Sequence, residues 1–407
     1  MVDSGPDTGA AAEYAYLQTP RAIRERAALV FAAARHQQLA HFRLDETRLS
    51  EVVERVLAVT RRAYPNVATI PYHGRYRHFD AGGVPRLQRF LEAIQGLSPD
   101  DRLRTSTELV ITSVLLDAGA GPDWCYREPD GTRFARSEGL AVASYHLFLG
   151  GGFSSAAAPM ADAAGLSRFD SARLAQAFQV SSANPLTGLE GRADLLARLG
   201  QVVASTPEYF SPQAPRLGDL GVYLKHSARD GKLAASRVLA AVLAALGEIW
   251  PGREQLAGKP LGDVWRHGSF GLVPFHKLSQ WLSYSLLEPL EAAGVTVTAL
   301  DELTGLPEYR NGGLFLDAGA LALVDQRARE AEHAVSSELV IEWRALTVAL
   351  LDRVAELVRE KLGLNAEQLP LARVLEGGTW SAGRAVAAEL RPGGGPPLKI
   401  VSDGTVF

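Results

Sequence analysis

Apolar residues recur at intervals of three and four along most of this chain, and few segments alternate as strands do. After Pro20, for example, Ile23, Ala27 and Val30 share one face of a helix, and proline suits the first helical turn. We therefore predict a mainly α fold. The expected helices cover residues 19–62 in two parts, the second carrying Leu49, Val52, Val53, Val56 and Leu57 on one face, and residues 87–95, 101–116, 235–249, 278–293 and 338–362.

Strand signals are confined to short segments. Val295–Thr298 is one of them. Near the C-terminus, Trp380–Leu390 and Leu398–Phe407 lie on either side of the glycines Gly393–Gly395. Their alternating character predicts a small C-terminal β-hairpin.

The domain organisation follows from length and composition. A chain of 407 residues with 47% apolar residues can bury a large core. The first residues are rich in glycine, aspartate and alanine, so residues 1–18 are expected to form a flexible tail. Three prolines predict a loop over Gly200–Leu217 that crosses between two lobes. Without an internal repeat, residues 19–407 are predicted to be a single two-lobed catalytic domain.

Charge, cysteine and histidine usage exclude several classes. A net charge of −4 argues against nucleic-acid binding. Cys125 is the single cysteine, and the nine histidines lack HxH or HExxH spacing, so no metal and no other cofactor are expected. The N-terminus lacks a secretory pattern and no apolar run is long enough for a bilayer, so we expect a cytoplasmic protein without a membrane partner. The sequence leaves the oligomeric state open.

Polar residues are densest between Leu115 and Ser155, where glycines and a proline predict a turn before a helix. Ser137 is expected to cap that helix, and Glu138 to lie near its positive end. A purely structural interpretation is also available, with Arg136 and Glu138 as a capped helix start and Trp124 as a lid on the core. We favour a small-molecule site. Its candidate residues are Asp123, Trp124, Arg136, Ser137 and Glu138.

A second polar segment, Arg75–Gly83, is predicted to be a loop. Its arginines lie near backbone amides freed by two glycines, an arrangement that holds a phosphate or carboxylate. The alternative is a solvated loop in which Asp80 caps a helix. The candidate binding residues are Arg75, Arg77, His78 and Asp80.

A third segment begins near His276. Helical spacing places Lys277, Gln280, Trp281, Tyr284 and Glu288 on one face. A carboxylate held against aromatic rings concentrates negative charge near a developing cation. The alternative is that Glu288 pairs with an arginine and Trp281 packs in the core.

Glu342 and Arg344 interrupt another apolar helix, and such charges are unfavourable there unless they meet partners. They are expected to orient the site or to bridge helices, and we favour the supporting role.

Several long motifs occur between about Arg77 and the C-terminus. They are RHFDAGG, LLDAGAGPDW, RSEGLAVAS, NPLTGLEGRADLL, VPFHKLSQWLSYSLLEPLE, LTGLPEYRNGGLFLD, EWRALTV, LEGGTWSAGR and PPLKIVSDGTVF. Together they resemble the uracil-catabolism protein four family. That family is associated with a uracil-degrading route that passes through a ribosyl intermediate and ends in urea.

More distantly, the chain is similar to the N-glycosidases that release queuine from queuosine 5′-monophosphate. Leu278–Leu290 and Val340–Leu346 occupy corresponding places in the chain order. This resemblance implies a two-lobed helical fold like that of DNA glycosylases. Where that family is expected to carry an acidic residue, Ser283 precedes Tyr284, and Glu288 lies further along the same helix.

Together these resemblances imply an N-ribosyl hydrolase that cleaves ribosylurea, or its 5′-phosphate, to urea and the sugar. Glu288 is the first candidate for stabilising positive charge on the sugar, with Glu138 and Asp123 next. His276 or Lys277 would protonate the leaving nitrogen or hold phosphate. Two alternatives stay open: an amidohydrolase that cuts the ureido C–N bond, and a non-catalytic protein that binds a pathway intermediate. The remaining expected roles are phosphate binding by Arg75, Arg77 and Arg136 and a pocket wall of Trp124, Trp281 and Tyr284.

Overall fold

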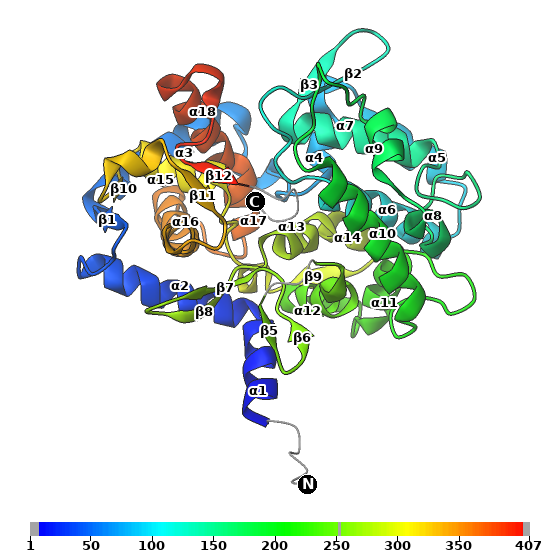
Figure 1. The fold of residues 1–407 in the computed structure, drawn as a ribbon, viewed down its shortest axis with the longest axis horizontal. Coiled ribbons are helices and arrows are strands. Elements are labelled where there is room, and N and C mark those ends of the chain that lie inside the picture. Colours follow the sequence, from blue (N-terminus) through cyan, green and yellow to red (C-terminus); the bar gives the residue numbers. More distant parts are fainter. Residues whose placement is uncertain (1–7, 251–253, 402–407) are drawn as a thin grey trace. The chain divides into compact units, whose positions relative to one another are not determined.

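Helices form most of the fold, as the apolar spacing predicts (Figure 1). The computed structural model describes residues 8–250 and 254–401. These residues divide into two units. Unit 1 comprises residues 8–73, 254–280 and 299–401, and unit 2 comprises residues 74–250 and 281–298.

Unit 1 is organised around the 25-residue helix α16 (Glu338–Leu362). Ser337 caps its start by accepting the N–H of Val340, and Gly363 ends it with a φ of +66°, a conformation that favours glycine. The helix packs against α2 (Pro20–Arg35) and α3 (Leu49–Ala63). The other helices of unit 1 are α1 (Thr8–Leu17), α15 (Tyr309–Asp317), α17 (Leu371–Val374), a π-helical turn (Leu375–Thr379) and α18 (Trp380–Leu390), with short 3-10 turns at Glu46–Arg48, Val67–Thr69, Leu300–Glu302, Gln326–Arg329 and Pro392–Gly394.

The strands of unit 1 form only two-stranded pairs. Three are antiparallel: β1 (Phe42–Leu44) with β10 (Leu321–Leu323), β5 (Gln255–Leu256) with β6 (Lys259–Pro260), and β7 (Val264–His267) with β8 (Gly271–Pro274). The fourth is parallel, between β11 (Glu332–Ala334) and β12 (Lys399–Val401).

Unit 2 is built around α6 (Pro99–Leu115), whose buried residues include both apolar and polar side chains. It packs against α7 (Arg136–Leu149), α10 (Leu189–Ser205), α11 (Asp219–Ser227) and α14 (Leu287–Ala292). The remaining elements are α4 (Tyr76–Phe79), α5 (Arg86–Ile94), α8 (Ala163–Ser167), α9 (Ser171–Ala177), α12 (Ala235–Leu246), 3-10 turns at Ala81–Gly83 and Gly247–Ile249, the antiparallel pair β2 (Cys125–Arg127) and β3 (Arg133–Ala135), and the parallel pair β4 (Lys232–Ala234) and β9 (Thr296–Thr298).

The predicted C-terminal hairpin is wrong within the described residues. Trp380–Leu390 forms helix α18, and β12 pairs in parallel with β11 instead of folding back on its neighbour. Small residues explain the helix: a Cβ added at Gly383 would lie 2.2 Å from the carbonyl oxygen of Arg310, so α18 packs closely on α15. Residues 402–407 of the predicted hairpin lie outside the described part.

Three other boundaries differ from expectation. Residues 8–17, assigned to a flexible tail, form α1, and Leu17 is fully buried against Leu261, Val264 and Leu272; residues 1–7 lie outside the described part. The helix expected over 278–293 is divided at Leu286 into α13 (Lys277–Ser285) and α14. The first part of the predicted loop at 200–217 belongs to α10.

Candidate functional site

A buried ion pair in unit 2 involves Arg75, the residue before α4. The Arg75 side chain is fully buried, and its Nη1 lies 3.0 Å from Oδ1 of Asp117. Its Nε donates to the Ser113 hydroxyl at 2.6 Å. Its Nη2 is buried and has no hydrogen-bond partner within the described residues. We call Arg75, Ser113, Asp117, Ser137 and Trp281 the Arg75 cluster.

Asp117 lies just after α6 and is held from two sides. Besides the pair with Arg75, it accepts the hydroxyl of Ser137 at 2.8 and 2.6 Å. Ser137 therefore does not cap α7, contrary to our expectation. The helix begins at Arg136, two residues earlier than a Ser137 cap would place it. Ala135 occupies the cap position without a side-chain bond, and the serine hydroxyl is directed to the carboxylate instead.

Aromatic rings bound the same cluster. Trp281 is buried, and the guanidinium carbon of Arg75 lies 5.5 Å from its ring centroid, a cation–π distance. The ring of His78 lies 5.8 Å from that of Trp281, and Tyr284 is buried on the same helix, α13.

Two carboxylates act on the buried Arg75. Burial lowers the pKa of Arg75, and the negative charges of Asp117 and Glu138 partly offset this effect. Glu138 lies in the first turn of α7, as predicted, and is half-buried. A cation that already faces two carboxylates suits a neutral acceptor, such as a carbonyl oxygen, better than a dianion.

Glu288, the first catalytic candidate, is paired with Arg77. Their Oε1 and Nη2 atoms lie 2.7 Å apart, and the two side chains are 28% and 29% exposed. The structure therefore contains the arginine pair that the sequence left open as the alternative for Glu288.

Two candidates from the turn before α7 lie in different surroundings. Asp123 is exposed. Trp124 is buried, stacks on Phe178 with ring centroids 5.8 Å apart, and donates its Nε1 hydrogen to the carbonyl of Phe178. This is the core packing that the sequence left open as the alternative for Trp124. Arg136 opens α7 with a φ of +55°, an uncommon conformation for a residue with a side chain.

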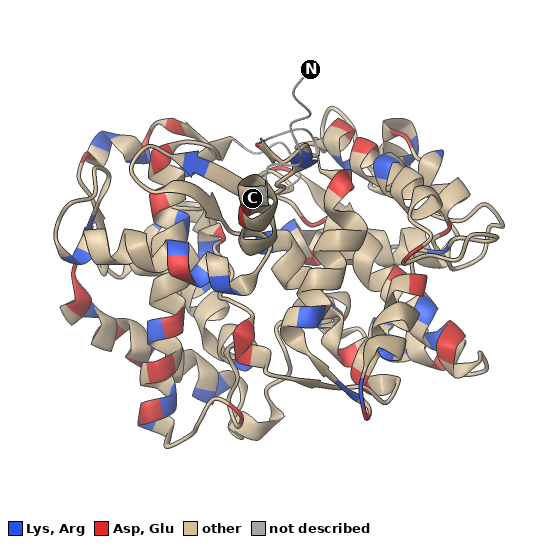
Figure 2. Cartoon of the chain, turned by 90° about the horizontal axis from the view of Figure 1, so that it is seen from below, with Lys and Arg blue, Asp and Glu red and all other residues tan. Residues whose placement is uncertain are grey.

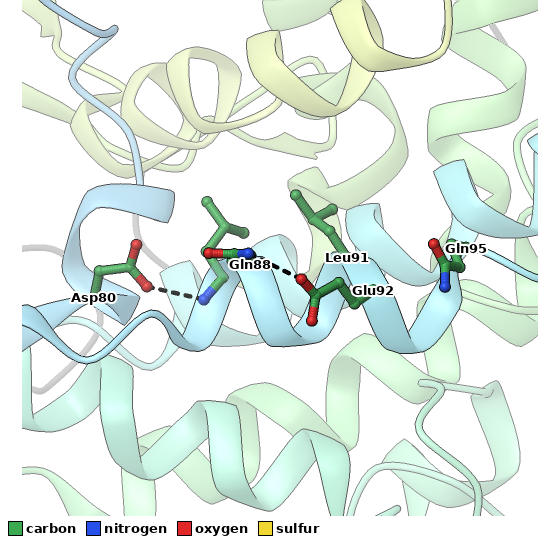
Figure 3. Close-up of a pocket in the computed structure, with 6 residues that line it drawn as sticks. Asp80, Gln88, Leu91, Glu92 and Gln95 are labelled. Atoms are coloured by element: carbon green, nitrogen blue, oxygen red, sulfur yellow. Dashed lines mark hydrogen bonds between the residues drawn. The ribbon is translucent and has the colours of Figure 1, made fainter.

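Asp80 lines an open groove along α5 (Figure 3). Its Oδ1 accepts the N–H of Leu87 in the first turn of α5. The groove has a volume of about 400 Å³, and Gln88 and Glu92 on it are bonded to each other. Asp80 thus supports the start of a helix, the alternative left open by the sequence.

In unit 1, Arg344 forms a bidentate pair with Asp263, both bonds measuring 2.7 Å. Asp263 also accepts hydrogen bonds from Trp265 Nε1 and from the N–H of Lys277. Burial acts to raise the pKa of Asp263, but the charge and hydrogen bonds of Arg344, with these further donors, lower it to about 2. This pair bridges β7, α13 and α16, which is the supporting role favoured for Arg344.

The other candidates in unit 1 are buried, and the side chains of His276 and Gln280 form hydrogen bonds within the fold. His276 is buried with a φ of +45°, its Nε2 lies 2.9 Å from the carbonyl oxygen of Leu17, and burial lowers its pKa. Gln280 donates to Thr304. Lys277 is buried at the start of α13.

Glu342 is buried in α16 and accepts the N–H of His41 at 3.2 Å. Burial raises its pKa to about 7.

The sequence candidates therefore separate into two groups. Arg75, His78, Ser137, Glu138 and Trp281 lie around one buried ion pair in unit 2. Trp124 and Tyr284 are also buried in unit 2, whereas His276, Lys277, Gln280, Glu342 and Arg344 are buried in unit 1. The sequence analysis assigned no role to Asp117, Ser113 or Asp263. The available signal for Ser113 and Asp117 was the run of polar residues in and just after α6.

Residues 8–250 and 254–401 contain no group of three or more His, Cys, Asp or Glu side chains placed to hold a metal ion. Nor is any helix of this part long and apolar enough to cross a membrane. Basic and acidic residues are interspersed along the helices (Figure 2).

The fold and the Arg75 cluster define a mainly helical protein with a buried, hydrogen-bonded ion pair in unit 2. More particularly, the chain belongs to the family described as protein of unknown function DUF1688, whose model matches residues 16–407. It is 40% identical to Protein urg3 of Schizosaccharomyces pombe over 396 residues, covering 95% of this chain and 96% of that protein. It is 38% identical to Uracil catabolism protein 4 of Lachancea kluyveri over 436 residues, covering 96% and 98%.

Proposed function

We propose that the protein takes part in uracil catabolism as an N-ribosyl hydrolase, cleaving ribosylurea or its 5′-phosphate to urea and ribose or ribose 5-phosphate. The name of the Lachancea kluyveri relative, similar over nearly its whole length, supports the pathway. The observation that carries the chemistry is the buried Nη2 of Arg75, which lies in a guanidinium beside Trp281 and has no hydrogen-bond partner among the described residues.

Hydrolysis of the N-glycosidic bond separates charge in a defined direction. The electron pair of the C1–N bond moves to the ureido nitrogen, positive charge develops on the sugar, water adds its hydroxyl to C1, and a proton goes to the leaving nitrogen. Negative charge on the leaving group is shared with the ureido carbonyl oxygen. A fixed cation at that oxygen and a carboxylate near C1 both stabilise the transition state.

The Arg75 cluster and the adjacent Glu138 offer these two groups. Nη2 of Arg75 donates to the ureido carbonyl oxygen, and Asp117 and Ser113 hold the guanidinium in place before the substrate arrives. Glu138, whose charge acts on Arg75, is the carboxylate that stabilises the sugar cation and directs water. Trp281 excludes water from the reacting bond.

The other candidates take subsidiary places in this proposal. Glu288 follows Glu138 because the charge of Glu138 acts on the buried Arg75, whereas Glu288 is 28% exposed and paired with Arg77. His276 takes no part in this proposal, because its Nε2 is bonded to the backbone carbonyl of Leu17 in unit 1. Arg136 is the candidate for a 5′-phosphate.

The test is incubation of the purified protein with ribosylurea, its 5′-phosphate and, as a control, uridine, with products identified by mass spectrometry. Intact urea together with the free sugar is the expected result. Release of ammonia and carbon dioxide would instead identify an amidohydrolase. Saturable binding of either compound without any product would identify a carrier of the intermediate, and both results would overturn the hydrolase proposal.

A further inference from the structure

Arg310 in unit 1 is a buried cation without a bonded counter-ion. It is the second residue of α15 and only 4% exposed. Its Nη2 is buried and has no hydrogen-bond partner, and its guanidinium forms no ion pair with a residue of the described ranges. Elsewhere in the described chain, Arg75, Arg216 and Arg344 are also largely buried, and each meets a carboxylate. Arg310 differs from these three because no carboxylate of the described residues pairs with it, and it differs from the buried Arg192, which donates to four backbone carbonyls.

Two aromatic rings hold the Arg310 guanidinium in place. Its central carbon lies 4.6 Å from the ring centroid of Trp380, the first residue of α18, and 5.2 Å from that of Tyr309. Ring faces attract a cation but accept none of its hydrogens in the plane of the guanidinium. The contacts therefore orient Arg310 and leave its in-plane donors available.

The nearest carboxylates along the chain are engaged with other groups. Glu308 caps α15 by accepting the backbone N–H groups of Arg310 and Asn311 at 2.8 and 2.7 Å. Asp317 is bonded twice by Arg391, at 2.8 and 2.5 Å. Neither carboxylate forms an ion pair with the Arg310 guanidinium.

A small cavity lies beside this cation. It is lined by Arg310, the Asp317–Arg391 pair, Arg384 and the turn at Gly394–Pro397, all in unit 1. Its volume of about 10 Å³ holds about one oxygen-sized atom. Arg384 is exposed, and its guanidinium carbon lies 5.7 Å from the same Trp380 ring.

We propose that this is an oxyanion site of the phosphate class. One oxygen of the anion occupies the cavity and accepts a hydrogen bond from Nη2 of Arg310, and the rest of the anion lies toward solvent beside Arg384. Arginine suits this task because its planar donors match the oxygens of phosphate. The site goes beyond the proposed hydrolase, since it involves none of the residues placed in that reaction.

The experiment is calorimetric titration of the full-length chain with inorganic phosphate at constant ionic strength, with chloride as the blank. Arg310→Gln should weaken phosphate binding by at least about tenfold, because a charge-assisted donor pair is lost. Arg353→Gln is the matched control: it removes an arginine of unit 1 that is 46% exposed and paired with Glu356, so phosphate affinity should not change. Arg310→Lys keeps the charge without the planar donors, so its phosphate affinity should lie between that of the wild type and that of Arg310→Gln.

Ribose 5-phosphate and ribose distinguish the source of the anion. Competition by ribose 5-phosphate but not ribose would identify the phosphate group of a sugar phosphate, whereas phosphate binding without such competition would identify the free ion. Thermal melts without phosphate establish that each variant is folded; if Arg310→Gln is not, Arg310→Lys carries the comparison. Absence of phosphate binding to the wild type, or equal binding by a folded Arg310 variant, would overturn the proposal whatever the protein does to ribosylurea.

Discussion

Arg75 Nη1 lies 3.0 Å from Asp117 Oδ1, with the arginine side chain fully buried and the aspartate side chain 6% exposed. The pair joins the start of α4 to the end of α6, and Ser137 adds a hydrogen bond from α7. At such burial each charge depends on the other, because water cannot replace a lost partner. The cluster proposed to bind substrate is therefore also part of what holds these helices of unit 2 together.

Neutralising Asp117 should destabilise the protein strongly. Asp117→Asn leaves the Arg75 cation without its closest counter-charge, and removing one member of a buried pair lowers the free energy of unfolding by about 3–5 kcal/mol. Urea denaturation followed by circular dichroism measures the change. Ser137→Ala is the control, since it removes a hydrogen bond to a charged group, worth about 1.5–3 kcal/mol. Equal, small losses in both variants would contradict a tightly interdependent pair.

Helices with an apolar stripe and clear ends were predictable from the sequence. Ser337 and Gly363 delimit α16 at the predicted residues, and Pro20 opens α2. The helix α18 was not predictable in this way. Its buried positions are alanines, a glycine and a valine, which carry little apolar contrast, and its close packing against α15 is a contact between distant parts of the chain.

The site was predictable in residue type but not in pairing. Arg75, Trp281 and Glu138 were all candidates from the sequence. In the structure, the Trp281 ring lies beside the buried Arg75 guanidinium, and the charge of Glu138 acts on it. Which charges are neutralised depends on contacts between distant parts of the chain: Asp263 and Arg344 are 81 residues apart, and Arg77 and Glu288 are 211 apart. Local periodicity contains no information on such pairs.

Stability should fall as the pH rises through neutrality, in part because of Glu342. Burial raises its pKa from 4.5 to about 7, so the folded state favours the protonated form. This contribution is fully present below about pH 4.5 and is lost as the pH rises through about 7, by at most about 3 kcal/mol. Glu342→Gln stays neutral and should flatten the decline in unfolding free energy measured by urea denaturation between about pH 5 and about pH 9.

Glu108 provides the contrast. Burial also raises its pKa to about 7, against the attraction of Arg216, so a decline from this group should remain in Glu342→Gln. An unchanged pH profile in Glu342→Gln would mean that its carboxyl ionises as readily in the folded as in the unfolded chain.

Chelation should leave the hydrolysis intact. The histidine spacing and the single cysteine predict no metal site. Turnover of ribosylurea after dialysis against EDTA is therefore expected to equal that of the untreated protein. Loss of turnover that one added metal restores would contradict this prediction and favour cleavage of the ureido C–N bond.

The two carboxylates Glu138 and Glu288 should respond differently to removal of their charge. Glu138→Gln keeps the shape of the side chain but removes the charge proposed to stabilise the sugar cation, so turnover should fall by at least about a hundredfold with little change in substrate affinity. Glu288→Gln disrupts a half-exposed pair with Arg77, so it should change the free energy of unfolding by less than about 1 kcal/mol and leave turnover nearly normal. Steady-state urea release and thermal melting on both variants separate the assignments. A hundredfold loss in a well-folded Glu288→Gln, with Glu138→Gln unaffected, would return Glu288 to the first place that the sequence gives it, because the pair with Arg77 would then have to open when substrate binds.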